Sequence, residues 1–245
     1  MSLIEHIQSA FLSILLYLFP HNCFETIFVH YDIFDDFCVK TVTSRFLGLA
    51  ITAGSIGVRL PQLLKIYRAK TGSGVTVIGL CLELLATFAT ASYSFENRFP
   101  FSSWGDSFFL SIQTFGICFM IFYYDFSLPV ASMFFVCSTI ATLFAMTRFI
   151  PVTVLSAMIV INMPITMIGR GLQILENYRN ASTGQLSLVS VLLMTGGAVA
   201  RIFTSVHETG DRLLVVGYFI GAATNAIILG QIFYYWQRSG KRKFQ

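Results

Sequence analysis

Long runs of apolar residues, separated by short polar turns, fill the chain from residue 44 onward. A helix that crosses the ~30 Å hydrocarbon core of a bilayer needs about 20 such residues. Seven segments have this character: 44–67, 75–95, 105–124, 128–146, 152–175, 186–206 and 213–236. Glycine, proline, asparagine and charged residues separate them, as expected of turns. The pattern predicts an all-α membrane protein with seven transmembrane helices.

The segment before the first span is apolar over residues 3–19 but short. Glu5 and His6 stand where a signal peptide would carry basic residues, so a cleaved leader is not expected. We interpret this segment as an interfacial helix, with an eighth span as the alternative.

Composition excludes most soluble functions. Hydrophobic residues make up 55% of the chain and charged residues 11%, with a mean hydropathy of +0.72. Soluble domains carry about 25% charged residues. Neither the four histidines nor the five cysteines show metal-ligand spacing, and no glycine-rich phosphate loop is present. We therefore expect no metal, no cofactor, no nucleic-acid partner and no enzymatic activity.

The distribution of charge predicts the orientation. Lys65, Arg68 and Lys70 lie at the end of the first span and in the loop after it, without an acidic residue, and the tail 237–245 is basic. Because basic loops remain cytoplasmic, the N-terminus should be lumenal or external and the C-terminus cytosolic. Lys241 and Lys243 resemble a dilysine retrieval signal of the endoplasmic reticulum. An anchor to anionic lipid is the alternative interpretation.

The second half of the chain matches the first half without a gap when Arg170 is aligned with Arg59. In this alignment, which we call the repeat register, Gln62 falls on Gln173, and the Ile-Phe-Tyr-Tyr string at 121–124 falls on the one at 232–235. Each copy holds three spans, and the fourth span joins them. The predicted units are an N-terminal segment 1–43, a first repeat 44–125, a linker helix 126–150, a second repeat 151–236 and the tail. They form two parallel three-helix bundles in a 3+1+3 plan.

The Leu-Pro-Gln-Leu string at 60–63 resembles the signature of PQ-loop proteins, and the 3+1+3 plan resembles that of PQ-loop and SWEET-type transporters. Pro61 is a candidate hinge. The second copy departs from the pattern because Leu172 replaces the proline while Gln173 is kept.

Three longer strings, at 97–105, 177–187 and 196–211, are similar to the mannose-P-dolichol utilization defect 1 family, and the resemblance extends from Cys23 onward. It implies an endoplasmic reticulum membrane protein needed for dolichol-phosphate mannose and glucose to serve as lumenal donors in N-glycan, GPI-anchor and mannosylation pathways. The implied partners are dolichol-linked phosphosugars, membrane lipid and lumenal glycosyltransferases.

Arginines within spans are costly, by about 2.5–3.5 kcal/mol each. Arg59 and Arg170 are equivalent in the repeat register and lie ~12 Å from the cytosolic side, counted at 1.5 Å per residue. Two guanidinium groups facing one path would suit a phosphate. Snorkelling to the interface is the alternative. Glu83 has a similar expected depth, which predicts an Arg59–Glu83 pair that either fixes helix packing or couples to protons.

Other polar residues within spans are weaker candidates. Arg201 is expected near Glu208 and Asp211 or near a phosphate headgroup. Asn225 lies midway along the last span, where it lines a substrate path or joins helices. Asn162 and Pro164 predict a kink with freed carbonyls, and Pro164 is a second hinge candidate. Gln62 and Gln173 accompany the arginines as headgroup candidates.

Cys23 and Cys38 both lie in the segment assigned to the lumen, where an oxidising compartment permits a disulfide. We expect them to be linked.

Three functions are compatible with these features. The first is a facilitator that admits a phosphosugar headgroup while the polyprenyl tail stays in lipid. The second is a helper that presents such lipids to lumenal glycosyltransferases or stabilises those enzymes. The third is a proton-coupled small-solute transporter with Glu83 as the carrier.

Overall fold

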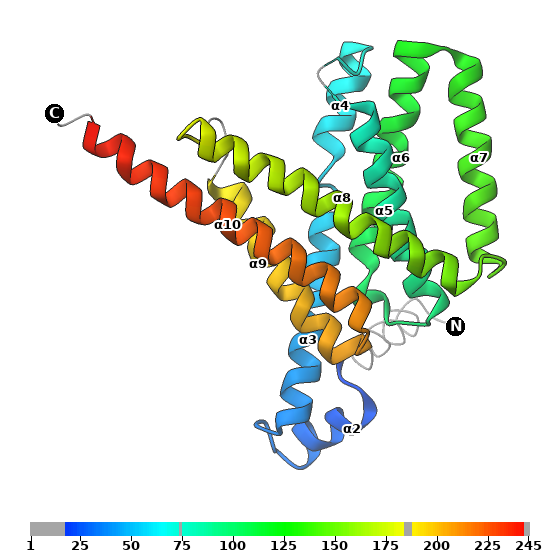
Figure 1. Ribbon diagram of the computed structural model, residues 1–245. Coiled ribbons are helices and arrows are strands. Elements are labelled where there is room, and N and C mark those ends of the chain that lie inside the picture. Colours follow the sequence, from blue (N-terminus) through cyan, green and yellow to red (C-terminus); the bar gives the residue numbers. More distant parts are fainter. Residues whose placement is uncertain (1–17, 74, 184–187, 243–245) are drawn as a thin grey trace.

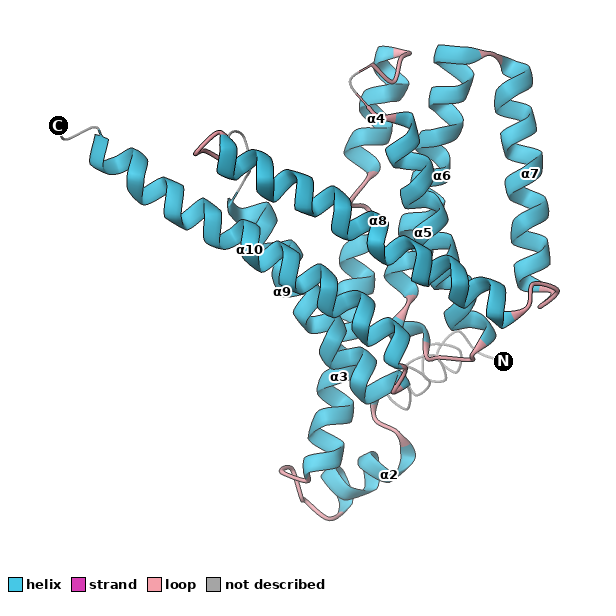
Figure 2. Ribbon diagram, in the orientation of Figure 1, coloured by secondary structure: helices cyan, strands magenta, loops and turns pink. Residues whose placement is uncertain are grey.

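The structure is a computed structural model that describes residues 18–73, 75–183 and 188–242. Within these ranges the regular structure is helical, and the helices are joined by short loops (Figure 2). The helices are α2 (His21–Phe24), α3 (Asp36–Ser55), α4 (Leu60–Ala69), α5 (Val77–Glu96), α6 (Gly105–Ile121), α7 (Leu128–Met146), α8 (Val152–Arg179), α9 (Leu188–Thr204) and α10 (Arg212–Arg242). Short π or 3-10 segments are η1 (Glu25–Val29), η2 (Phe101–Ser103), η3 (Phe122–Phe126) and η4 (Ser205–Thr209).

Six helical segments of the described chain are long and apolar enough to cross a membrane. They are Asp36–Ala69, Val77–Glu96, Gly105–Phe126, Leu128–Met146, Val152–Arg179 and Arg212–Tyr235. The sixth predicted span corresponds to α9, which has 17 residues and continues directly into η4. The prediction of an all-α chain with several membrane-spanning helices is confirmed.

The first predicted span differs from a single helix. It is divided into α3 and α4 by a turn at residues 56–59, and α3 begins eight residues before the predicted start. Pro61 lies in the first turn of α4, where its missing N–H costs least and where it disfavours helix in the preceding residues. In the second repeat, with Leu172 at the equivalent position, α8 runs without a break, Pro164 included.

The bundle has two opposite ends, named here after Lys70 and Asp211. The Lys70 end holds the C-terminal ends of α4 and α8. The Asp211 end holds η2 and the turn between α9 and α10. Figure 1 shows α8, α9 and α10 running together at an incline to α4, α5 and α6, with α7 at the outer edge.

The two repeats pack in the same way. The third helix of each, α6 or α10, contacts the other helices of its own repeat. Between repeats, α5 packs on α8 and α3 packs on α9, which is the exchange that a two-fold axis would produce. Leu80, Ile117 and Ile121 form the core of the first repeat. Their equivalents in the repeat register, Val191, Ile228 and Ile232, form the core of the second.

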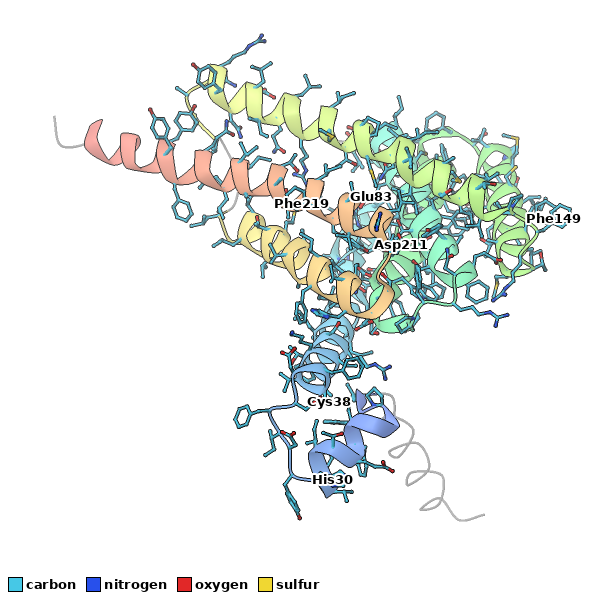
Figure 3. The ribbon with its side chains drawn as sticks, turned by 60° about the horizontal axis from the view of Figure 1, so that its bottom comes forward. His30, Cys38, Glu83, Phe149, Asp211 and Phe219 are labelled. Carbon is cyan, nitrogen blue, oxygen red and sulfur yellow. A yellow bond between two sulfur atoms is a disulfide. The ribbon has the colours of Figure 1, made fainter. Side chains whose placement is uncertain are left out.

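The N-terminal hairpin, residues 20–38, projects from the Asp211 end of the bundle. Cys23 and Cys38 are joined by a disulfide across it, with Cα atoms 5.2 Å apart. Asp35 caps α3 by accepting a hydrogen bond from the backbone N–H of Cys38 at 2.8 Å. Figure 3 shows His30 and Cys38 on this projection, away from Glu83 and Asp211. The predicted interfacial helix lies almost entirely outside the described residues, as does Lys243, and the side chain of Lys241 is likewise not described.

Candidate functional site

Arg59 lies in the turn between α3 and α4, where the helix break leaves backbone groups without helical partners. Gln113 of α6 satisfies them: its Oε1 accepts from the backbone N–H of Arg59 at 2.9 Å, and its Nε2 donates to the carbonyl of Ser55 at 2.8 Å. The Arg59 guanidinium donates through Nη2 to the Glu83 carboxylate and through Nη1 to Gln62 Oε1 at 3.4 Å. The break thus places a charged pair between the first and second helices of the repeat.

Arg170 repeats part of this arrangement. Its Nη1 donates to Gln173 Oε1 at 3.3 Å, and its Nη2 lies 3.7 Å from the sulfur of Met194 on α9. Met194 is the equivalent of Glu83 in the repeat register. A thioether is only a weak acceptor and carries no charge. Within the described part of the chain, Arg170 therefore has no anionic partner.

Each arginine is held inside its own repeat, and no contact among the described residues joins Arg59 to Arg170. The charges of the two halves therefore differ. In the first repeat, Glu83 neutralises the charge of Arg59. In the second repeat, Arg170 keeps its positive charge within a span, which is costly unless an anion binds there.

Arg201 has a different partner from the predicted one. It is 3% exposed and pairs with Asp106 at the start of α6, with Nη2 2.6 Å from Oδ1 and Nε 3.2 Å from Oδ2. Its Nη1 also donates to the carbonyl of Ser102 at 2.7 Å. The expectation that Arg201 meets Glu208 and Asp211 is wrong, because its side chain extends from α9 toward α6 across the repeat boundary.

Glu208 and Asp211 instead accept hydrogen bonds from neutral donors. Glu208 accepts from the hydroxyls of Ser44 at 3.0 Å and Ser102 at 2.5 Å. Asp211 accepts from the hydroxyl of Tyr93 at 2.8 Å and caps α10 through the N–H of Leu214 at 3.0 Å. With the Arg201–Asp106 pair, these bonds tie both repeats together at the Asp211 end.

A cavity of about 190 Å³ lies at the interface between the repeats, between α5, α6, α8 and α10. Its polar lining consists of neutral groups: Thr87, Thr90, Ser107, Asn162, Thr166 and Tyr218. Asn162 is the one candidate from the sequence that the structure places there.

Asn225 lies elsewhere, buried on α10, and its equivalent in the first repeat is Thr114 on α6. Among the described residues neither Asn225 Oδ1 nor Thr114 Oγ1 has a hydrogen-bond partner. The described residues also contain no group of three His, Cys, Asp or Glu side chains that would hold a metal ion.

Sequence reasoning missed Met194, Thr90 and Asp106. Met194 and Thr90 could have been found from the sequence, because the repeat register aligns Met194 with Glu83 and Thr90 with Arg201. Asp106 gave no comparable signal, since it lies far from Arg201 along the chain.

A comparison with known families agrees with the repeat. The PQ loop repeat matches twice, over residues 43–103 and 156–213, and the two matches are offset by nearly the distance from Arg59 to Arg170 along the chain. The first segment runs from within α3 to the end of η2, and the second runs from within α8 to the start of α10. The chain is thus a helical protein with membrane-spanning character that carries two PQ loop repeats.

Proposed function

We propose that this protein binds lipid-linked phosphosugars in the endoplasmic reticulum membrane and admits their headgroup between its two repeats. Dolichol-phosphate mannose and glucose are the proposed substrates, and the proposed outcome is their use as lumenal donors for N-glycans, GPI anchors and mannosylation. The polyprenyl tail would stay in the surrounding lipid.

The observation that carries the proposal is the state of Arg170. A guanidinium in a span, with an amide oxygen and a thioether as its described partners, retains an unbalanced positive charge. A neutral solute would leave that charge uncompensated, whereas a phosphodiester supplies an anion and suits the planar donor fork. This favours a phosphorylated ligand over a free sugar.

The proposal includes a topology. The six long apolar helices and α9 form seven spans, as two three-helix repeats joined by α7. The Lys70 end faces the cytosol, since Lys65, Arg68 and Lys70 lie there. The Cys23–Cys38 disulfide supports a lumenal hairpin, because disulfides persist in oxidising compartments. Lys241 and Lys243 are proposed to act as the retrieval signal.

In this orientation the lumenal side is the closed one. The bonds of Arg201, Glu208 and Asp211 tie the repeats together there. The arginines lie on the cytosolic side of these bonds, where the substrate is proposed to approach. Release to the lumen then requires the Arg201–Asp106 pair and its neighbours to separate.

A helper role is the second candidate, and the projecting hairpin favours it. Tyr31 and Phe34 are 80% and 91% exposed there. Exposed aromatic side chains of this kind are common at protein contacts. Replacement of both by serine would impair sugar transfer in cells if the helper role holds, but would leave headgroup movement in liposomes unchanged.

The experiment for the main proposal replaces Arg170 in cells that lack the endogenous protein. Arg170→Gln should impair lumenal mannosylation, read as surface display of GPI-anchored proteins and as completed lipid-linked oligosaccharide, at normal protein level and location. Arg179→Gln, at the exposed end of the same helix, is the matched control and should support both. Normal mannosylation with Arg170→Gln would show that the arginine binds no substrate phosphate.

A further inference from the structure

The cavity between α5, α6, α8 and α10 is lined by neutral hydrogen-bonding groups. The hydroxyl of Thr87 donates a hydrogen bond to the backbone carbonyl of Glu83, and that of Thr90 to the carbonyl of Ala86, each at 3.0 Å. Both hydroxyl oxygens therefore remain available as acceptors. Among the described residues, Asn162 is hydrogen-bonded through its backbone carbonyl, which accepts from Thr166 at 3.0 Å, and its carboxamide is available to a ligand. Neutral donors and acceptors placed side by side suit a polyhydroxylated ligand.

The cavity has room for a small ligand. A volume of about 190 Å³ accommodates a single hexose ring with its hydroxyls. The side chain of Tyr218 adds an aromatic surface for the C–H face of a sugar.

The cavity lies one helical turn from the charged groups described above. On α8, Thr166 lines the cavity and Arg170 follows four residues later; on α5, Thr87 lines it and Glu83 precedes it by four. Four residues correspond to about 6 Å along a helix axis, and residues so spaced share a face. A ring in the cavity would therefore have its phosphate on the side of Arg170.

The equivalent place in the other half is filled. In the repeat register the cavity-lining residues Thr90, Leu213 and Gly217 become Arg201, Ser102 and Asp106. These three are bonded to one another through the Arg201 guanidinium. Of the two related positions, the ion pair occupies one and leaves the other open.

From these observations we infer that this cavity is the binding site for the single sugar ring of the headgroup, with the ring toward the Asp211 end and the phosphate toward Arg170. The inference rests on the proposed function, which it deepens by assigning the two parts of the headgroup to two places. It also implies one sugar site per chain, because the counterpart is closed by Arg201.

The test measures binding of two probes to the purified full-length protein in nanodiscs: a short-chain polyprenyl phosphate, and the same lipid carrying mannose on the phosphate. The dissociation constant of the lipid without mannose, divided by that of the lipid with mannose, gives the gain in affinity due to the sugar, called here the advantage due to the sugar. Asn162→Ala should lower this advantage by about three- to tenfold, the effect of losing one or two neutral hydrogen bonds. Binding of the lipid phosphate without sugar should stay within about twofold of the unchanged protein.

A second variant fills the cavity with the pair that the other half already contains. Thr90→Arg combined with Gly217→Asp supplies both partners, so the new arginine has a counter-ion. This variant should abolish the advantage due to the sugar. Ile51→Ala is the matched control, because Ile51 is the equivalent of Asn162 in the first repeat, and it should leave the ratio unchanged.

The outcomes separate the two proposals. Two results would show that the cavity is not the sugar site while the phosphate site stands. In the first, both probes bind the unchanged protein with equal dissociation constants. In the second, the advantage due to the sugar persists in Asn162→Ala. If neither probe binds the unchanged protein, the proposed function itself fails. A ratio lost in Asn162→Ala and kept in Ile51→Ala supports the cavity.

Discussion

Met194 in the second repeat occupies the place that Glu83 occupies in the first, and each lies against Nη2 of the arginine in its own repeat. Since the other shared partners, Gln62 and Gln173, are alike, this exchange alone changes the charge of the pair. Around these two arginines the side chains are therefore placed alike, and the repeats differ in electrostatics.

Met194→Glu should give Arg170 the counter-ion that Arg59 already has. Because the new carboxylate competes with a phosphate for the same donors, affinity for a polyprenyl phosphate should fall by roughly ten- to a hundredfold. Thermal stability should stay equal or rise. Binding to purified protein measures the effect, with Met194→Leu as the uncharged control. Undiminished affinity with Met194→Glu would contradict a phosphate site at Arg170.

Arg59→Gln should leave Glu83 without its cation. The Glu83 side chain is 36% exposed, so the loss in unfolding free energy should be about 1–2 kcal/mol, below that of a fully buried pair. Adding Glu83→Gln should restore accumulation of the protein. If Arg59 also contacts the headgroup, the double variant will fold and still fail to support mannosylation, and Arg59→Lys will support it partially. Full activity of the double variant would limit Arg59 to a structural role.

Arg201→Gln should be the most destabilising of the arginine changes. The pair with Asp106 is buried, at 3% and 15% side-chain exposure, and loss of one partner from such a pair costs about 3–5 kcal/mol. Arg201→Gln with Asp106→Asn should recover most of this loss in thermal unfolding of the purified protein. Lys40→Ala, which removes the exposed pair with Asp36, is the control and should have little effect. Equal stabilities for Arg201→Gln and Lys40→Ala would show that the buried pair does not hold the repeats together.

The orientation can be tested with glycosylation. Asn180 begins a natural sequon in the turn after α8, at the end assigned to the cytosol, and it should carry no glycan. Tyr31→Asn with Ile33→Thr creates a sequon on the hairpin, where both side chains are exposed. This site should be modified, seen as an endoglycosidase-sensitive mass shift. A glycan on Asn180 would invert the topology.

The helices were predictable because long apolar runs have few alternative structures. The predicted span 128–146 coincides with α7. Hydropathy did not reveal that α3 begins at Asp36, since its first turns contain the charged residues Asp36, Lys40 and Arg45. It also did not reveal the break at 56–59, which depends on Pro61 together with the bonds from Gln113.

The pairing of Arg59 with Glu83 followed from depth alone, because both residues belong to neighbouring helices of one repeat. The expected depth did not identify the partner of Arg201, since several acidic residues lie near the same level in the membrane. The rotation of each helix about its axis decides which of them a side chain contacts. The cavity was equally hidden. Its polar residues come from four helices and none is charged, so neither spacing nor charge marks them in the sequence.

The protein is proposed, above all, to admit a lipid-linked phosphosugar headgroup to a path between its repeats. The most direct measurement reconstitutes the purified chain in liposomes that carry a short-chain mannosyl-phosphate lipid, and follows how fast headgroups of the inner leaflet become accessible outside. We expect rapid exposure with the unchanged protein, slow exposure with Arg170→Gln and normal exposure with Arg179→Gln. Exposure no faster than in protein-free liposomes, or equally fast with Arg170→Gln, would contradict the proposal.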